Sequence, residues 1–288
     1  MRCWLTVWFD RGGMGVYSYL GFIKRSELLI VALLFFAIYA PVWASAQTAQ
    51  ADMALIPAGL FTLGSDTHTA YQQCLQNNKV CKKKWFADEE PKHSVYLESF
   101  YLDKYEVNQK QYLKVMGGNP SHFKGDDRPV EGVTWHGAKE YCEQIGKRLP
   151  TEAEWEKAAR AGQRTIFHWG NQMVSMKANF CDTHCPKKWK ETQFDDGFAK
   201  TAPGGSFPPN DYGLYDTAGN VYEWVQDWYD EDYYKTKFTK SPKGPVSGTL
   251  KVVRGGSWIN YSVGVRPSDR TGMKTNRRYD FVGFRCAQ

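Results

Sequence analysis

The stretch GLYDTAGNVYEW at residues 213–224, together with RGGSW at 254–258 and GFRCA at 283–287, decides the fold of this chain. A fourth segment, RLPTEAEWE at 148–156, contains a proline followed by a helix-capping pattern. After residue 165, Gly, Pro, Asn and Asp recur every few positions with aromatic residues between them, which is typical of turns. We therefore expect a loop-rich domain in which helices and strands are short.

Residues 1–46 are typical of an export signal. Two basic residues precede an apolar run from Leu28 to Tyr39, and Ala44-Ser45-Ala46 gives the small-residue pattern of a signal peptidase site. The apolar run is short for a membrane span, so we expect cleavage and a mature domain at 47–288 with no membrane partner. Retention of the signal as an anchor is the alternative. Met14 is a second candidate for the start of translation.

The expected location of the mature chain is the periplasm or the extracellular space. Its charge pattern gives no reason to expect nucleic acid as a partner. The 37 Lys and Arg residues are interspersed with 31 Asp and Glu residues, and the formal net charge is only +6. Binding to a phosphate backbone favours a basic stripe or patch, and none is visible in the sequence.

Cysteine usage agrees with an oxidising compartment. Of the seven cysteines, Cys3 lies in the signal, which leaves an even number in the mature chain. Proximity predicts two short bridges and elimination predicts a third: Cys74 with Cys81, Cys181 with Cys185, and Cys142 with Cys286. The alternative is a zinc site built from Cys181, His184 and Cys185, but no second ligand pair with zinc spacing accompanies it.

Periodicity and capping signals predict a small set of regular elements. They are a strand, a turn and a second strand within 54–65, a half-buried strand within 93–105, and helices over 108–116, 134–145 and 151–160. The polar, lysine-rich stretch from Thr67 to Glu90 is predicted to be a surface loop closed by its disulfide. No repeat or linker divides the chain, so we expect one domain.

From Met53 to Ala287, these motifs together resemble the formylglycine-generating enzyme (sulfatase-modifying factor) family. The resemblance implies an α+β fold of the C-type-lectin-like kind, a single loop-rich domain with short helices and small antiparallel sheets. It also implies the long-range bridge between Cys142 and Cys286. A fold does not by itself fix a function, so the reaction has to be argued from the site.

The resemblance fails at the reaction centre. The family's enzymes carry two cysteines shortly after Arg-Gly-Gly-Ser, which bind copper(I), activate dioxygen and oxidise a substrate cysteine to formylglycine. The matching positions here are Asn260 and Val265, and Tyr222 replaces a tryptophan of the enzymes. Copper(I) prefers soft thiolate ligands, which an amide and an isopropyl group cannot replace. The sequence therefore predicts no copper–thiolate catalysis.

The resemblance implies two structural calcium sites, because the family binds calcium at matching positions. The first set is Asn179, Phe180, Asp196 and Phe198, and the second is Asp216, Gly219, Val221 and Glu223. Carboxylate, amide and backbone carbonyl oxygens are the ligands that calcium prefers. The alternative is that Asp196 caps a turn and Glu223 pairs with an arginine.

Six residues are expected near the family's substrate groove: Tyr222, Ser257, Asn260, Tyr261, Arg266 and Arg270. Aromatic side chains with a few fixed polar groups suit a peptide or sugar ligand. We expect Asn260 and Arg270 to be exposed in this groove, whereas Trp258 is better explained as a core residue.

Two classes of function remain. The first is an exported modification or maturation factor for a peptide or protein, as in family branches that lack the cysteine pair, such as pyoverdine-maturation and nitrite-reductase accessory proteins. The second is a non-catalytic peptide- or glycan-binding or assembly module. Formylglycine generation at a different site is a further alternative. An intact groove with altered chemistry favours the first class, and a filled groove favours the second.

Overall fold

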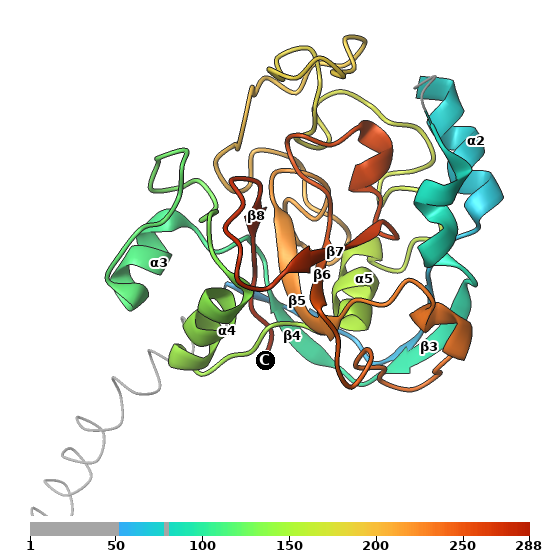
Figure 1. Ribbon diagram of the computed structural model, residues 1–288, viewed down its shortest axis with the longest axis horizontal. Coiled ribbons are helices and arrows are strands. Elements are labelled where there is room, and N and C mark those ends of the chain that lie inside the picture. Colours follow the sequence, from blue (N-terminus) through green and yellow to red (C-terminus); the bar gives the residue numbers. More distant parts are fainter. Residues whose placement is uncertain (1–51, 78–80) are drawn as a thin grey trace, which may run out of the picture. The chain divides into compact units, whose positions relative to one another are not determined.

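The computed structural model describes residues 52–77 and 81–288 (Figure 1). The predicted signal at 1–46 and the alternative start at Met14 lie outside the described residues. Within the described part of the chain, no helix is both long and apolar enough to cross a membrane.

Two small antiparallel sheets contain the first four strands. They are β1 (Met53–Ile56) paired with β4 (Phe100–Asp103), and β2 (Gly59–Leu63) paired with β3 (His93–Leu97). The predicted strand, turn and strand within 54–65 are thus β1 and β2. The predicted strand within 93–105 is instead two short strands that belong to different sheets.

The third sheet carries the motifs near the C-terminus. Its order is β7–β6–β5–β8, with β5 (Tyr222–Trp228), β6 (Leu250–Arg254), β7 (Arg270–Lys274) and β8 (Val282–Gly283). β6 pairs antiparallel with both β5 and β7, whereas β5 and β8 run parallel. The sheet therefore places the end of the GLYDTAGNVYEW segment beside the start of RGGSW and of GFRCA.

All three predicted α-helices are present: α3 (Gln109–Met116), α4 (Trp135–Gln144) and α5 (Glu152–Arg160). Thr151 caps α5, accepting from the Glu154 N–H while the Glu154 side chain accepts from the Thr151 N–H. Asn108 forms the same capping box at α3, and Thr134 caps α4. These caps satisfy amide groups that a helix N-terminus leaves unpaired, so local sequence was sufficient to place the helices.

The predicted surface loop from Thr67 to Glu90 is wrong. This stretch forms α2 (Thr67–Asn77) and the 3-10 helix η1 (Lys83–Glu89). Asp66 accepts from the N–H and the hydroxyl of Thr69, and Ala70 and Cys74 are buried in a cluster with Phe86. Because this stretch is mostly polar, its few buried residues did not stand out in the sequence. Tertiary packing of those residues stabilises the two helices.

All three predicted disulfides are present: Cys74–Cys81, Cys142–Cys286 and Cys181–Cys185. The bridge between Cys142 and Cys286 joins α4 to the GFRCA segment across 144 residues of chain. Cys142 and Cys286 are fully buried in the largest apolar cluster, together with Trp224 of β5 and Phe284. The loop-rich α+β architecture is thus confirmed, with its core between α4 and the four-stranded sheet.

Residues 161–221 contain no helix or strand and form a long irregular connection between α5 and β5 (Figure 1). The short bridge between Cys181 and Cys185 lies within this segment. A satellite apolar cluster that includes Phe167, Ala178 and Phe180 packs beneath it, and Val265 belongs to the same cluster. This segment bonds to the RGGSW turn through Gly219, whose N–H donates to the Gly255 carbonyl, and through Asn220, whose carbonyl accepts from the Trp258 N–H.

Candidate functional site

The RGGSW segment begins at the end of β6 and turns back sharply. Gly255 and Gly256 have φ angles of +90° and +70°, a region that residues with side chains rarely adopt. A Cβ atom on Gly256 would lie 2.3 Å from the carbonyl oxygen of Gly264, so only glycine allows the turn to pack against the 3-10 helix η3 (Ser262–Val265). This close approach fixes the course of the segment that holds Asn260 and Val265.

Asn260, which the sequence predicts at the first cysteine position of the family's enzymes, has both ends of its side-chain amide engaged. The amide nitrogen donates to the Tyr222 hydroxyl at 2.9 Å, and the amide oxygen accepts from the Ser257 hydroxyl at 2.6 Å. The Tyr222 hydroxyl in turn donates to Asp269 Oδ2 at 3.4 Å. Burial raises the pKa of Tyr222 well above its usual value, so the phenol stays protonated. This polar chain is satisfied without a ligand.

Val265, which the sequence predicts at the second cysteine position, is fully buried. Its side chain belongs to the apolar cluster that contains Phe167, Phe180 and Ala218. A fully buried isopropyl group offers neither a nucleophile nor a metal ligand. The six cysteines of the described residues all lie in the three disulfides, so this part of the chain contains no free thiol.

A covering loop, residues 181–194, is bonded to the backbone of the segment that holds Asn260. Three hydrogen bonds join them: Cys181 N–H to the Asn260 carbonyl (2.8 Å), Trp189 Nε1–H to the Ile259 carbonyl (3.0 Å), and Ser262 N–H to Glu191 Oε2 (2.8 Å). The ammonium of Lys187 also lies 5.8 Å from the Trp258 ring centroid. These contacts were not predictable from local sequence patterns, because they join residues about 70 positions apart.

Exposed aromatic side chains border the same segment. Tyr261 is half-buried and stacks on Trp85 with ring centroids 6.3 Å apart, while Trp85 and Trp189 are 37% and 45% exposed. Trp258 is buried and meets Phe123 edge to face at 5.4 Å, which confirms its assignment to the core. We call Trp85, Trp189 and Tyr261 the aromatic border.

The expectation that Arg270 is exposed in a groove is wrong. Arg270 is buried and donates from Nε and Nη2 to the two carboxylate oxygens of Glu152 at 2.7 and 2.9 Å. Arg266 is also buried and forms a two-point pair with Glu89 at 2.6 and 2.8 Å. Both arginines are structural, because a buried guanidinium needs a matched carboxylate. The pairing of Glu89 with Arg266 was not predicted, because the stretch from Thr67 to Glu90 was interpreted as a surface loop.

The first candidate cation site contains one buried side-chain oxygen that has no hydrogen-bond partner. Asn179 is fully buried, and its side-chain oxygen has no hydrogen-bond partner. Asp196 is buried nearby in the fold, and its carboxylate accepts from the amides of Phe180 and Phe198 at 2.9 and 2.8 Å. Burial raises the pKa of Asp196 to about 7. Asp196 therefore caps a turn, as the alternative predicted, while the Asn179 oxygen remains suited to a hard cation.

In the second candidate site, the Glu223 carboxylate already has hydrogen-bond partners within the protein. The Glu223 carboxylate accepts two hydrogen bonds from Arg285 and one from Trp155, each 2.7 Å long. One oxygen of Asp216 has no partner, and burial raises the pKa of Asp216 to about 6. Glu106, which the sequence did not single out, is a third buried carboxylate here and accepts from the Val221 amide. The predicted alternative, an arginine on Glu223, is thus found.

The two candidate sites lie next to each other because their loops touch. The backbone N–H of Asn220 donates to the backbone carbonyl of Asn179 at 2.9 Å. A Cβ on Gly219 would lie 1.9 Å from the same carbonyl oxygen, so no other residue fits there. The close contact makes the two loops one structural unit.

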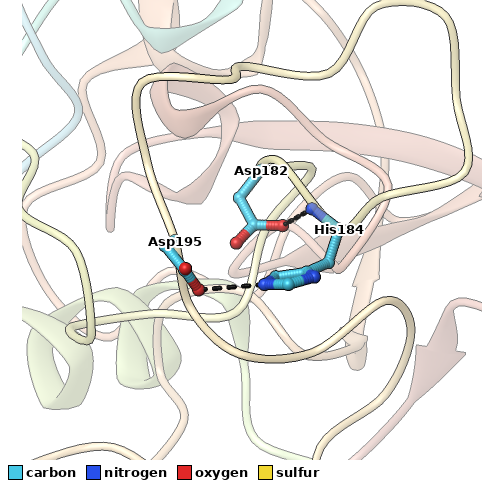
Figure 2. Close-up of side chains that lie close together, drawn as sticks. All are labelled: Asp182, His184 and Asp195. Carbon is cyan, nitrogen blue, oxygen red and sulfur yellow. Dashed lines mark hydrogen bonds and ion pairs between the residues drawn. The ribbon is translucent and has the colours of Figure 1, made fainter.

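A third cluster, unexpected from the sequence, joins Asp182, His184 and Asp195 (Figure 2). One ligand atom from each lies within 4.8 Å of the others, and His184 Nε2 is 3.1 Å from Asp195 Oδ1. His184 and Asp195 are exposed, and the two oxygens of Asp182 accept from backbone amides. The alternative zinc site with Cys181 and Cys185 is wrong, because a disulfide sulfur is not a thiolate ligand.

With this geometry established, comparison with known proteins identifies the class. A family profile described as the sulfatase-modifying factor enzyme 1-like domain matches residues 40–288. The formylglycine-generating enzyme of Mus musculus is 32% identical over 295 residues, which cover 83% of this chain and 75% of the mouse protein. The chain therefore belongs to the sulfatase-modifying factor family.

Other relatives show how varied this family is. "Serine/threonine-protein kinase pkn1" of Chlamydia pneumoniae is 37% identical over 230 residues, so this chain spans only about a third of that protein (35%). "Inactive C-alpha-formylglycine-generating enzyme 2" of Bos taurus is 39% identical over 169 residues, covering 55% of this chain and 50% of the bovine protein. Similarity to a named member therefore does not transfer its activity.

Two solved structures confirm the fold. PvdO from Pseudomonas aeruginosa has a TM-score of 0.65 and 28% identity, covering 82% of this chain and 93% of its own. Treponema denticola variable protein 1 has a TM-score of 0.62 and 26% identity, covering 82% of this chain and 94% of its own. The expected C-type-lectin-like, loop-rich domain is thus the observed one.

The structural role of Arg270 gives a stability prediction. Arg270→Ala should lower the free energy of unfolding by about 3–5 kcal/mol, because it leaves the buried Glu152 carboxylate without its two-point partner. Arg277→Ala, at an exposed position, should change it by less than about 0.5 kcal/mol. Urea denaturation followed by tryptophan fluorescence measures both. An Arg270 variant as stable as the Arg277 variant would return Arg270 to the list of ligand-binding candidates.

Proposed function

We propose that this chain is an exported polypeptide-binding maturation factor that uses the family scaffold without copper–thiolate chemistry. The proposal is supported by the resemblance, which places Asn260 and Val265 where the family's enzymes carry their reactive cysteine pair. The first is tied into a polar chain and the second is buried among apolar side chains. Neither position offers the soft ligand that copper(I) requires.

The covering loop favours binding over catalysis in this proposal. It is bonded to Ile259, Asn260 and Ser262, so the backbone of this segment is held in place, while the side chains of Ile259 and Asn260 stay half-buried. A fixed, partly exposed segment without a thiolate fits a role in recognition or assembly better than a reaction there. The aromatic border offers large rigid side chains of the kind that dominate protein–protein interfaces. Export is supported by the three disulfides, which persist in oxidising compartments.

Absence of copper chemistry is tested with the chain that begins at Gln47. We expect no oxygen uptake above a protein-free copper control when copper and a cysteine-containing sulfatase peptide are supplied. An active formylglycine-generating enzyme assayed in parallel is the positive control. Turnover that scales with the concentration of this chain would refute the proposal, because it would require a ligand set other than the one described.

Polypeptide binding is tested by selecting displayed peptides on the immobilised chain that begins at Gln47. Peptides enriched on it should bind at least about tenfold more weakly to Trp189→Ala or Trp85→Ala, since truncating a central aromatic anchor typically costs 2 kcal/mol or more. The matched control is Leu113→Ala, which removes an exposed apolar side chain on α3. Equal affinity for all variants, or no enriched peptide, would count against the aromatic border as the recognition surface.

We further propose that the Asn179–Asp196 site holds calcium, which would supply a structural charge and no reaction step. The support is the orphaned, fully buried Asn179 oxygen beside a buried carboxylate. Phe180 and Phe198 would contribute backbone carbonyls. The second set, around Asp216 and Gly219, remains a prediction, because Arg285 already neutralises Glu223.

Calcium at a level of 100 times its dissociation constant should raise the melting temperature by roughly 5–10 °C over the EDTA-treated chain. Asp196→Asn should abolish this shift, because it removes the charged ligand of the first site. Asp195→Asn, which alters the exposed cluster of Figure 2 instead, should retain it. Differential scanning calorimetry measures all three chains. An EDTA-insensitive melting curve, or loss of the shift only in Asp195→Asn, would disprove this assignment.

A further inference from the structure

A cleft of about 600 Å³ opens between β2, the start of α2 and the last turn of α5. Its wall continues along the chain that follows α5, as far as Ile166. None of the residues Ser257, Asn260, Tyr222 and Val265 lines it. The cleft is therefore a feature separate from the former reaction centre, and inferences about it do not depend on the proposed function.

The charged side chains that line the cleft are mostly cationic: Lys92, Lys157, Arg160, Arg164 and Arg266, against the single carboxylate of Asp66. Two of the five cations are neutralised by buried partners, since Arg160 pairs with Glu156 and Arg266 with Glu89. Asp66 uses one carboxylate oxygen to cap the start of α2 at Thr69. Three cations thus face one carboxylate in this wall.

Lys157 is the unusual member of this group because it is only 4% exposed. Its ammonium donates to the carbonyl oxygens of Pro57 and Gly59 at 2.6 and 3.0 Å, and among the described residues no carboxylate forms an ion pair with it. Lysine is almost never buried unless it is paired. An ammonium has three hydrogens, so one remains for a further acceptor. Burial also lowers the pKa of Lys157, which an anion beside it would reverse.

Arg164 supplies a second charged contact. It is exposed, follows α5 within the cleft wall, and forms no ion pair with any carboxylate of the described residues. Its planar fork of five N–H donors matches the oxygens of a carboxylate or phosphate. Lys157 therefore provides a buried ammonium group, and Arg164 provides an exposed guanidinium group on the same wall of the cleft.

The cleft also carries apolar surface. Leu60 of β2 is 73% exposed, and Phe61, Ile166 and Tyr212 line the same space half-buried. Binding sites for small ligands combine such apolar walls with a few placed polar groups. The combination of unmatched cations with exposed apolar side chains indicates a ligand that has both characters.

We propose that this cleft binds an oxyanion, a carboxylate or a phosphate, that is attached to an apolar or aromatic body. Lys157 and Arg164 contact the oxyanion, and Leu60 and Tyr212 contact the apolar body. The shared chemistry is a negatively charged oxygen group. A peptide carboxylate and a phosphate ester are its two sources.

Titration calorimetry with the chain that begins at Gln47 tests the proposal and separates the two sources. The probes are N-acetylphenylalanine, phenyl phosphate and the neutral N-acetylphenylalanine amide. At least one of the two anions should bind, more weakly at high salt, and the neutral amide should bind at least about tenfold more weakly than the anion does. The stronger anion identifies the source. Failure of both anions to bind at about 10 mM overturns the proposal, as does equal binding of the amide.

Variants locate the binding within the cleft. Arg164→Gln changes an exposed side chain and should weaken the anion about tenfold while leaving the melting temperature unchanged. Lys157→Met keeps the length of the buried side chain and should weaken it at least as much. Lys110→Gln, at an exposed position on α3, is the matched control and should have no effect. If Lys157→Met does not fold, Arg164→Gln still decides; unchanged affinity in Arg164→Gln refutes the assigned contacts.

Discussion

A buried network of arginines and carboxylates holds this loop-rich chain together. Glu152 and Glu156, on α5, meet Arg254 at the end of β6 and Arg270 at the start of β7. The carboxylates lie in the family's capping motif and Arg254 begins RGGSW, so the network joins segments about 100 residues apart. Removing one partner of such a pair leaves an uncompensated buried charge. Loss of either partner therefore strongly destabilises the fold. Short helices and small sheets supply too little regular hydrogen bonding to fix these segments otherwise.

The same network positions the segment that holds Asn260 and Val265. Arg254 and the two glycines after it set the course of the turn, whatever residues follow. Asn260 and Val265 take no part in these ion pairs, since Asn260 bonds to Tyr222 and Val265 joins an apolar cluster. The residues that hold the segment in place are thus different from those that the sequence predicts at the reactive positions, so the fold alone does not fix the function.

Local signals and cysteine arithmetic predicted much of the architecture. The Gly-Gly stop after Met116 predicted α3, the apolar face ended by Gly146 predicted α4, and the capping box at Thr151 predicted α5, because such signals act within a few residues. The even number of cysteines in the mature chain predicted the bridges that the structure contains. The stretch from Thr67 to Glu90 was not predictable in this way. Its helices are stabilised by contacts with Val263 and Arg266, far along the chain, and its polar composition concealed that burial.

The sequence by itself determined the family, the disulfides, the capped helices and the absence of sulfur from the turn after Arg254. The family, the capped helices and the two short bridges follow from residue identity and short spacing, whereas the bridge between Cys142 and Cys286 was predicted by elimination and by the family resemblance. Only the tertiary structure decided that Arg266 and Arg270 are buried partners of Glu89 and Glu152 rather than groove residues. It alone revealed the loop over Asn260 and the unmatched Lys157. The reason is physical: whether a charge faces water or a partner depends on which distant segment packs against it.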